Sequence, residues 1–403
     1  GRMSRIELAS KKKKSIAIKG EMVLKEAEER AHLFEHSWRQ VVKKFYKKDL
    51  HGVDWDFYKK EYTRFLPHIN NGFDFAEMMS ELLGELNASH TGCRYRPAYN
   101  RTADATASFG LYYDESYTGK GIKIVEVINK GPFDKKASKV AAGHVIEKID
   151  GVEILAETNF YVMLNRKAGK YTLVSMFDPA SGERWEETVK PISRGAEFGI
   201  RYDRWVENCR EITERVSNGR VGYVHVRGMN TSSYKTVYEE VLGRNAGMDA
   251  VIVDTRFNGG GWLHDDLATF LGGKIYMKIQ PRGQDIGREP MFKWTKPSCV
   301  LMSEGNYSDA HLFPYVYRAL GVGKLVGMPV PGTGTAVWWE RLPGGYVFGI
   351  PEVGMVGNDG SFMENTQLEP DVKVANDPSK VTNGQDQQIE AAVKVLLSEV
   401  DGK

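Results

Sequence analysis

In the second half of the chain, short apolar segments alternate regularly with segments of helical periodicity. Apolar runs occupy 221–226, 250–255 and 299–302, and helical segments occupy 234–242 and 263–271 between them. Runs of this kind are typical of strands that are buried on both faces of a parallel sheet. The alternation therefore predicts an α/β domain with helices on both faces, and ligands of such sheets bind beyond the carboxyl ends of the strands.

Length and charge set the next limits. The chain has 403 residues, which predicts two or three domains. Its 55 basic and 53 acidic side chains nearly cancel, so nothing favours a nucleic-acid partner. The three cysteines, Cys93, Cys209 and Cys299, are far apart and predict neither a disulfide framework nor a zinc site. No apolar stretch is long enough for a membrane span.

The chain is expected to contain four parts. Residues 1–19 read as a remnant of an upstream domain, with two short strands around a run of lysines. Helical periodicity then predicts a helical bundle over 20–101, in which Asp54 caps a helix. Short strands predict a β-rich domain over 102–194, with a linker that begins at Thr102 and a short helix that begins at Gly131. The α/β domain takes 195–403.

One strand-to-helix turn of the α/β domain contains three consecutive glycines. The strand at 250–255 is followed by Arg256-Phe257-Asn258-Gly259-Gly260-Gly261-Trp262. Glycines allow positive φ angles and leave amide N–H groups uncovered. With the helix N-terminus, these amides can hold an anion or a developing oxyanion, although a tight turn explains the same residues. A nucleotide P-loop is not indicated, because no Gly-Lys-Ser/Thr follows.

A second strand-to-helix turn carries a serine with two interpretations. Ser308 directly precedes a predicted helix that begins at Asp309. Serine is common as a helix N-cap, and this is the simpler interpretation. An exposed serine at a helix N-terminus can also be a nucleophile, because the helix dipole favours developing negative charge.

A serine nucleophile needs a base, and nine histidines are available. His90 stands out because it lies outside the helical periodicity, in Ser89-His90-Thr91-Gly92 at the end of the bundle. His225 lies inside an apolar strand and is expected to be a core or rim residue. His264 follows the glycine turn and His311 follows the serine, so either can lie near a site without being the base.

A metal-binding alternative comes from the helical bundle. His32-Leu33-Phe34-Glu35-His36 matches the His-x-x-Glu-His pattern of some zinc peptidases. Phe34 shares a face with core positions of its helix, and no third ligand can be named. The match is therefore expected to be fortuitous, and no metal or other cofactor is predicted.

Taken in order along the chain, these motifs resemble one family. A bundle ending in Ser-His, a Gly-Leu-Tyr-Tyr segment, an Arg-x-Asn-Gly-Gly-Gly turn and a Tyr-Ser-Asp-Ala turn are similar to the C-terminal half of tricorn proteases. These belong with the tail-specific, or C-terminal-processing, serine peptidases. The resemblance covers about residues 20–403. It implies a multidomain α+β and α/β fold: a helical bundle, a PDZ-like domain and an α/β peptidase domain with a ClpP/crotonase-like sheet.

The resemblance also implies roles for individual residues. Ser308 would be the nucleophile and His90 the general base, with Ser89 and Glu364 completing a tetrad that orients the imidazole. For Glu364 this role depends wholly on the resemblance, because a glutamate in such a loop is ordinarily an exposed carboxylate.

The same resemblance implies two binding elements. The amide of Asp309 and a glycine of the triplet, Gly261 ahead of Gly260, would form an oxyanion hole. The PDZ-like loop, made by Gly110, Leu111, Tyr112 and Tyr113, would offer backbone N–H groups to a peptide C-terminus.

On this basis the chain is expected to be a serine endopeptidase that cleaves short or unfolded peptides. Segment 277–283 has no acidic residue where archaeal tricorn proteins bind a basic side chain, so an apolar preference is as plausible. The resemblance further implies a hexamer and missing upstream β-propellers. The three unpaired cysteines favour a cytoplasmic protein, and a periplasmic one is the alternative if a signal peptide was removed. The alternative is a catalytically silent scaffold that binds peptides.

Overall fold

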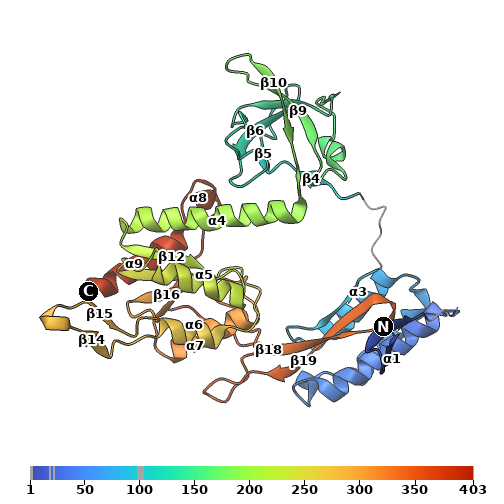
Figure 1. The fold of residues 1–403 in the computed structure, drawn as a ribbon. Helices are drawn as coiled ribbons and strands as arrows, with labels where there is room; N and C mark the ends of the chain where they lie inside the picture. The colour runs from blue at the N-terminus through green and yellow to red at the C-terminus, as the bar shows by residue number, and fades with distance from the viewer. Residues whose placement is uncertain (1–2, 18–19, 21–22, 98–103, 403) are drawn as a thin grey trace. The chain divides into compact units, whose positions relative to one another are not determined.

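The computed structural model describes residues 3–17, 20, 23–97 and 104–402 (Figure 1). The chain divides into two compact units. The first combines Gly1–Ala98 with Thr333–Asn365, and the second combines Tyr99–Gly332 with Thr366–Lys403. The fold class is the expected one, a mixture of a helical bundle, a β-rich module and an α/β sheet.

The first unit is a helical bundle packed on a small sheet. An exposed antiparallel hairpin comes first, and Asp54 caps α2 as expected, since its side chain accepts from the amide of Phe57 at 2.9 Å. The helices and the three-stranded sheet, in the order β18-β19-β3, then share one buried core. The elements are β1 Met3–Glu7, β2 Lys12–Ile16, α1 Glu26–Lys44, α2 Trp55–Thr63, α3 Gly72–Gly84, β3 Gly92–Tyr95, β18 Thr335–Arg341 and β19 Tyr346–Gly354.

The sheet of this unit differs from the expectation that the bundle ends near residue 101 and everything after 195 is α/β. Strand β19 pairs antiparallel with β3, which lies about 250 positions earlier, and the side chains of Phe348 and Ile350 are buried in the bundle core. Local periodicity cannot reveal such a partner, because the contact is made between distant segments. As a result, segment Thr333–Asn365 belongs to the first unit.

The β-rich module of the second unit is an antiparallel sheet with strand order β10-β9-β7-β6-β5 around its own core. A short pairing of β4 with β11 closes the module at the start of helix α4. Its elements are β4 Ala107–Ser108, β5 Leu111–Tyr113, β6 Ile122–Val127, β7 Val145–Ile149, β8 Val152–Glu153, β9 Thr172–Phe177, β10 Arg184–Val189 and β11 Ile192–Ser193. The expected linker at Thr102 lies partly outside the described residues.

The short helix predicted from Gly131 is wrong. The chain there forms consecutive turns, in which Gly131 donates to the carbonyl of Ile128 at 2.9 Å and Asp134 donates to the carbonyl of Gly131 at 3.2 Å. Lys130 has a φ of 62°, and the Asp134 carboxylate accepts its amide at 2.6 Å. The aspartate side chain thus holds the backbone in a turn that a helix cannot continue. Helical structure in the described part of this module is the 3₁₀ segment Phe160–Leu164.

The α/β part of the second unit confirms the predicted parallel sheet. All neighbouring strands in the order β12-β13-β16-β17-β20 are parallel. Alternate side chains of β13 face opposite layers: Ile252 packs with α4 and α9, whereas Val253 packs with α5, α6 and α7. The elements are α4 Arg194–Ser217, β12 Val221–His225, α5 Thr231–Leu242, β13 Ala250–Asp254, α6 His264–Leu271, β16 Ser298–Met302, α7 Asp309–Ala319, β17 Lys324–Gly327, β20 Val372–Lys373, α8 Pro378–Thr382 and α9 Gln387–Val400.

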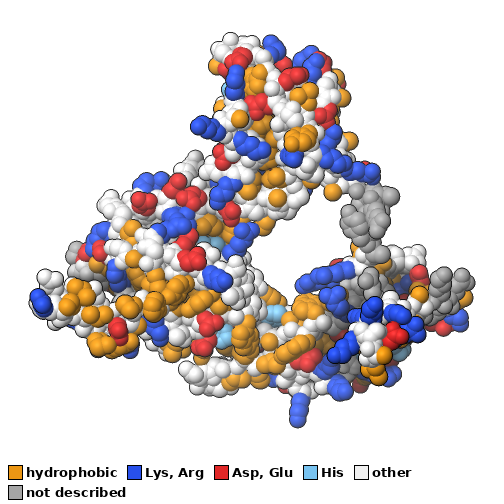
Figure 2. Space-filling model, viewed as in Figure 1, with side chains coloured by type: hydrophobic (Ala, Val, Ile, Leu, Met, Phe, Trp, Pro, Cys, Tyr) orange, Lys and Arg blue, Asp and Glu red, His pale blue; other side chains and the backbone are white. Residues whose placement is uncertain are grey.

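A two-stranded hairpin, β14 Met277–Ile279 with β15 Gly287–Glu289, extends from this sheet between α6 and β16. Its flanks carry exposed apolar side chains, including Tyr276 at 71% and Phe292 at 67% exposure, and Figure 2 shows hydrophobic side chains over the hairpin. Within the part of the chain that the structure describes, no helix is both long and apolar enough to cross a membrane.

Candidate active site

Ser308 lies at the carboxyl end of β16, at the turn that leads into α7. Its backbone has φ 58° and ψ −124°, and its side chain makes no N-cap hydrogen bond to the helix. The simpler interpretation of this serine as an ordinary cap is therefore wrong. A non-glycine residue with positive φ is strained, and such strain is concentrated at functional sites.

The glycine turn after β13 lies directly against this serine. A Cβ atom built on Gly260, which has a φ of 94°, would lie 2.5 Å from Cβ of Ser308 and 3.1 Å from the amide nitrogen of Asp309. Only a residue without a side chain allows such an approach. The structure thus brings Gly260, Gly261, Ser308 and Asp309 together at the carboxyl ends of β13 and β16.

Two amides of this turn differ in whether they already donate a hydrogen bond within the protein. The amide of Gly260 donates to Oδ1 of Asn258 at 2.8 Å, so it is already used within the turn. The amide of Gly261 has no hydrogen-bond acceptor among the residues that the structure describes. Of the two glycines, Gly261 therefore has the amide that can donate a hydrogen bond to a ligand, and Gly260 allows the close approach of the two turns.

Asn258 connects the two turns. Its side-chain amide donates to the carbonyl of Val226 at 2.7 Å, and its own carbonyl accepts the amide of Tyr307 at 3.0 Å. The side chain is fully buried. This residue fixes the glycine turn both to the end of β12 and to the residue before Ser308.

The carboxylate of Asp309 connects the two helices that follow these turns. Its Oδ2 accepts the amides of Leu263 at 2.5 Å and His264 at 3.2 Å, and its Oδ1 lies 2.5 Å from Nδ1 of His264. Asp309 is 1% exposed. This hydrogen bond raises the pKa of His264 from its ordinary value, which favours the protonated imidazole beside the carboxylate.

The first unit brings together three other predicted site residues. Oγ of Ser89 donates to Oε2 of Glu364 at 2.9 Å and lies 2.8 Å from Nδ1 of His90. The amide of Ser89 also donates to Oε1 of Glu364 at 2.5 Å. A chain of hydrogen bonds thus runs from the imidazole through a hydroxyl to a buried carboxylate.

Thr335 belongs to this cluster and was not predicted. Its Oγ1 lies 2.9 Å from Nδ1 of His90 and 3.0 Å from Oγ of Ser89. The threonine is the first residue of β18, a strand that the sequence analysis did not anticipate. Strand β18 is placed by β19, which pairs with β3 just after His90, so no local signal marked this residue.

Burial controls the protonation of this cluster. Desolvation lowers the pKa of His90 to about 4, and it raises the pKa of Glu364 against the hydrogen bonds from Ser89 that lower it. His90 is therefore neutral at pH 7. With Nδ1 facing two hydroxyl oxygens that lead to a carboxylate, the tautomer with hydrogen on Nδ1 is favoured, which leaves Nε2 as the basic nitrogen.

The predicted site residues fall into two groups. Ser89, His90 and Glu364 lie in the first unit, and Ser308, Asp309, Gly260 and Gly261 lie in the second. Each group is assembled within its own unit by contacts between segments distant in sequence. Only the order of the motifs along the chain linked them in the sequence analysis.

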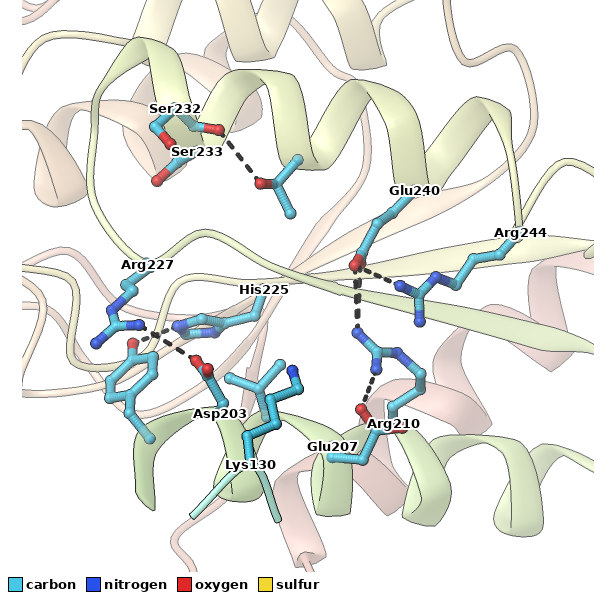
Figure 3. Close-up of a pocket in the computed structure, with 13 residues that line it drawn as sticks. Lys130, Asp203, Glu207, Arg210, His225, Arg227, Ser232, Ser233, Glu240 and Arg244 are labelled. Carbon is cyan, nitrogen blue, oxygen red and sulfur yellow. Dashed lines mark hydrogen bonds and ion pairs between the residues drawn. The ribbon is translucent and has the colours of Figure 1, made fainter. Parts of the chain in front are cut away.

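His225 lines a charged cavity of about 430 Å³ between α4 and α5 (Figure 3). Its Nε2 lies 2.5 Å from the hydroxyl of Tyr202, and burial lowers its pKa to about 4, as fits the expected core or rim residue. Arginines of this cavity pair with acids of its own wall, such as Arg227 with Asp203 and Arg210 with Glu207. The cavity therefore has little uncompensated charge.

Side chains of the zinc-peptidase pattern in α1 bind other residues of the protein. Nε2 of His36 lies 2.9 Å from Oε1 of Glu340, and Glu35 binds both Arg39 and Lys59 at 2.8 Å. Among the described residues, no group of three or more His, Cys, Asp or Glu side chains is arranged to hold a metal ion.

Segment 110–113, for which the resemblance implies peptide binding, lies against α4. The amide of Gly110 donates to Oγ of Ser108 at 2.9 Å, and the guanidinium of Arg201 covers the ring of Tyr112 at 4.6 Å. Leu111 is buried in the core of the module and Tyr113 packs against it. One backbone donor of the loop is therefore used internally.

Comparison with known proteins gives two family matches. Residues 220–374 match the model of peptidase family S41, and residues 26–84 match the tricorn protease C1 domain. The tricorn protease of Thermoplasma acidophilum is 24% identical over 387 residues, which cover 93% of this chain and 35% of that protein. A tricorn protease homolog of Saccharolobus solfataricus is 26% identical over 389 residues, covering 91% and 35%.

Solved structures agree on the fold. The crystal structure of the tricorn protease superimposes with a TM-score of 0.86 at 22% identity, over 100% of this chain and 40% of that one. Mature CPAF gives a TM-score of 0.54 at 13% identity, over 94% and 98%. The chain spans about 35% of the length of the two curated relatives named above.

Proposed function

Because the chain is a tricorn-related member of the S41 peptidase superfamily, we propose that it is a serine endopeptidase that cleaves short or unfolded peptides through an acyl-enzyme at Ser308. One observation carries the proposal. The glycine turn approaches so closely that a Cβ on Gly260 would lie 2.5 Å from Cβ of Ser308. An ordinary helix cap gives no reason for this contact, whereas a nucleophile beside an oxyanion hole requires it.

In the proposed reaction, Oγ of Ser308 attacks the scissile carbonyl while Nε2 of His90 accepts its proton. Serine is a weak nucleophile until a base takes that proton. The imidazolium then donates the proton to the leaving amine, and water repeats the sequence on the acyl-enzyme. The lowered pKa of His90, about 4, keeps the imidazole neutral at pH 7, which is the form that can accept a proton.

Ser89, Thr335 and Glu364 would act on His90 and not on the substrate. Their hydrogen bonds to Nδ1 and to one another favour the tautomer that leaves Nε2 basic. The carboxylate of Glu364 would also stabilise the imidazolium through the intervening hydroxyls. The proposal requires the imidazole of one unit to meet the hydroxyl of the other, within one chain or between copies.

The oxyanion would be bound by the amides of Asp309 and Gly261. The amide of Asp309 belongs to the first turn of α7, where backbone N–H groups have no partner within the helix. The amide of Gly260 is engaged by Asn258, which favours Gly261 as the second donor.

Hydrolysis of a fluorogenic peptide library tests the proposal. The parent is expected to cleave, and Ser308→Ala is expected to lose roughly 10⁴-fold or more in kcat. Ser303→Ala is a matched control on the same loop, because Oγ of Ser303 accepts the amides of Phe257 and Gly305 and has no proposed part in the reaction. Equal rates for the parent and Ser308→Ala would reject the nucleophile.

A scaffold that binds peptides without cleaving them is the second candidate. Its support is the edge strand β5 with the loop at Gly110 in the PDZ-like module. Peptide binding without turnover by the longest natural form of the protein would favour this candidate.

We also propose that copies of the chain associate. The exposed apolar side chains beside the β14–β15 hairpin, such as Tyr276 and Phe292, are the surface that supports this. Analytical ultracentrifugation of the parent and a Tyr276→Ser, Phe292→Ser variant measures it, and the variant is expected to dissociate.

A further inference from the structure

The residue that follows the proposed nucleophile places a buried negative charge beside the oxyanion hole. Asp309 would contribute its amide to the hole, and the carboxylate of the same residue is 1% exposed. This carboxylate accepts the amides of Leu263 and His264, which begin the helix just after Gly261. The side chain of Asp309 thus links the two backbone segments that would provide the oxyanion donors.

A bare carboxylate in this position would oppose the reaction. Negative charge develops on the substrate oxygen in the transition state, and a like charge nearby in a water-poor site raises its energy. Among the residues that the structure describes, the cationic partner of the Asp309 carboxylate is His264, whose Nδ1 lies 2.5 Å from Oδ1. The protonated imidazole cancels the charge, whereas the neutral imidazole does not.

We propose that His264 is a positioning residue of the peptidase: in its protonated form it neutralises the Asp309 carboxylate and holds the start of α6 to the start of α7, so that the oxyanion hole functions only while His264 carries its proton. This inference rests on the proposed function, because the hole has its purpose only in acyl transfer. His264 itself does not touch the substrate.

The charged groups around His264 favour the protonated form. Asp309 faces it from α7, and Asp265 and Asp266 lie on its own helix. Together they raise the pKa of His264 against the effect of burial. The ring of Trp262 packs edge-on against the imidazole, with centroids 5.3 Å apart, and adds no charge. His264 therefore keeps its proton to a higher pH than an ordinary histidine does, and releases it as the pH rises further.

The pH dependence of kcat and KM tests the proposal, with the parent compared with His264→Gln and His264→Arg. In the parent, kcat is expected to fall on the alkaline side while KM stays constant, because the oxyanion forms only in the transition state. The Gln variant has a donor but no charge, so kcat should be about 10- to 100-fold lower and lose the alkaline fall. The Arg variant keeps the charge and should keep activity at alkaline pH.

A second measurement does not depend on turnover. The pKa of His264, followed by NMR in Ser308→Ala, should be above the ordinary value and should fall in the additional Asp309→Asn variant. The affinity of a peptide boronic acid, whose adduct with a serine is a tetrahedral anion, should weaken in the parent over the same pH range.

The outcomes separate the two proposals. If the parent cleaves peptides but its alkaline fall persists in both His264 variants, or does not follow the NMR titration, the role of His264 is rejected and the peptidase stands. If the parent neither cleaves peptides nor binds the boronic acid, both proposals are rejected. If His264→Gln does not fold, the results for His264→Arg and Asp309→Asn decide in its place whether the role of His264 is rejected.

Discussion

At the scale of single residues, hydrogen-bond geometry decides between interpretations that the sequence leaves open. Ser308 has the sequence context of an N-cap, and its positive φ and missing cap bond exclude that role. Glu364 has the sequence context of an exposed loop carboxylate, and it is 5% exposed and bound by Ser89. No pattern marked Thr335, because its neighbours in space are remote along the chain.

The first prediction concerns Thr335. Replacing its hydroxyl with a methyl group in Thr335→Val removes one of the two oxygens beside Nδ1 of His90. We expect kcat/KM for peptide hydrolysis to fall about 10-fold, equivalent to about 1.4 kcal/mol, as the tautomer is held less firmly. Thr335→Ser keeps the hydroxyl and should stay within about 2-fold of the parent. Parent-like activity in the Val variant would contradict a role for this residue.

At the scale of elements, the α/β sheet was predicted well and the sheet of the first unit was not. Strands β12, β13 and β16 are mainly apolar runs separated by helical segments, so local pattern suffices for them. Strands β18 and β19 are recognised only through their pairing with β3. The predicted helix at Gly131 failed because an aspartate side chain holds that backbone in turns.

The second prediction concerns the strand-to-helix turn after β13. In Gly260→Ala the new Cβ would lie 2.5 Å from Cβ of Ser308, at a φ of 94°. We expect the free energy of unfolding to fall by about 2 kcal/mol or more and kcat to fall about 100-fold, since the serine must shift. Urea denaturation and peptide hydrolysis measure the two effects.

Gly259→Ala is the matched control for this turn. No atom lies within 4 Å of a Cβ at Gly259, and its φ is not in the left-handed region. Its stability and kcat should both remain near those of the parent. Similar losses in the two variants would show that the turn tolerates no side chain at all, and the specific contact with Ser308 would lose its support.

At the scale of the whole molecule, the chain is two units whose site residues were linked in the sequence analysis only by the order of the motifs. That order was enough to predict the family, which the comparisons bear out. It could not predict that segment 333–365 returns to the first unit, because this depends on long-range strand pairing.

The third prediction concerns the stability of the second unit as a function of pH. Burial lowers the pKa of His225 and of His311 to about 4. In the unfolded chain histidine titrates near 6.5, so between about pH 6.5 and 4 the unfolded state binds more protons. The contribution of these two histidines to the free energy of unfolding should therefore be fully present above pH 6.5. Below that pH the free energy of unfolding should fall, by up to about 1.4 kcal/mol per pH unit for each histidine.

Urea unfolding at pH 7 and pH 5 measures this dependence. His311→Gln should reduce the slope with pH, whatever its effect on stability at pH 7. The contribution of His264 to the free energy of unfolding depends on pH in the opposite direction, because its pKa in the folded state is raised. That contribution is complete below pH 6.5 and is lost as the pH rises through the pKa of the folded state. An unchanged slope in His311→Gln would contradict the assignment of a neutral, buried imidazole.

The dependence of Ser308 reactivity on His90 can be measured with a fluorophosphonate probe. The probe is allowed to react with the parent and with His90→Ala, and the modified residue is identified by mass spectrometry. We expect modification at Ser308 in the parent and a rate at least about 10³-fold lower in His90→Ala, since the serine then has no base. Modification of another serine, or equal rates in the two proteins, would contradict the proposed pairing of His90 with Ser308.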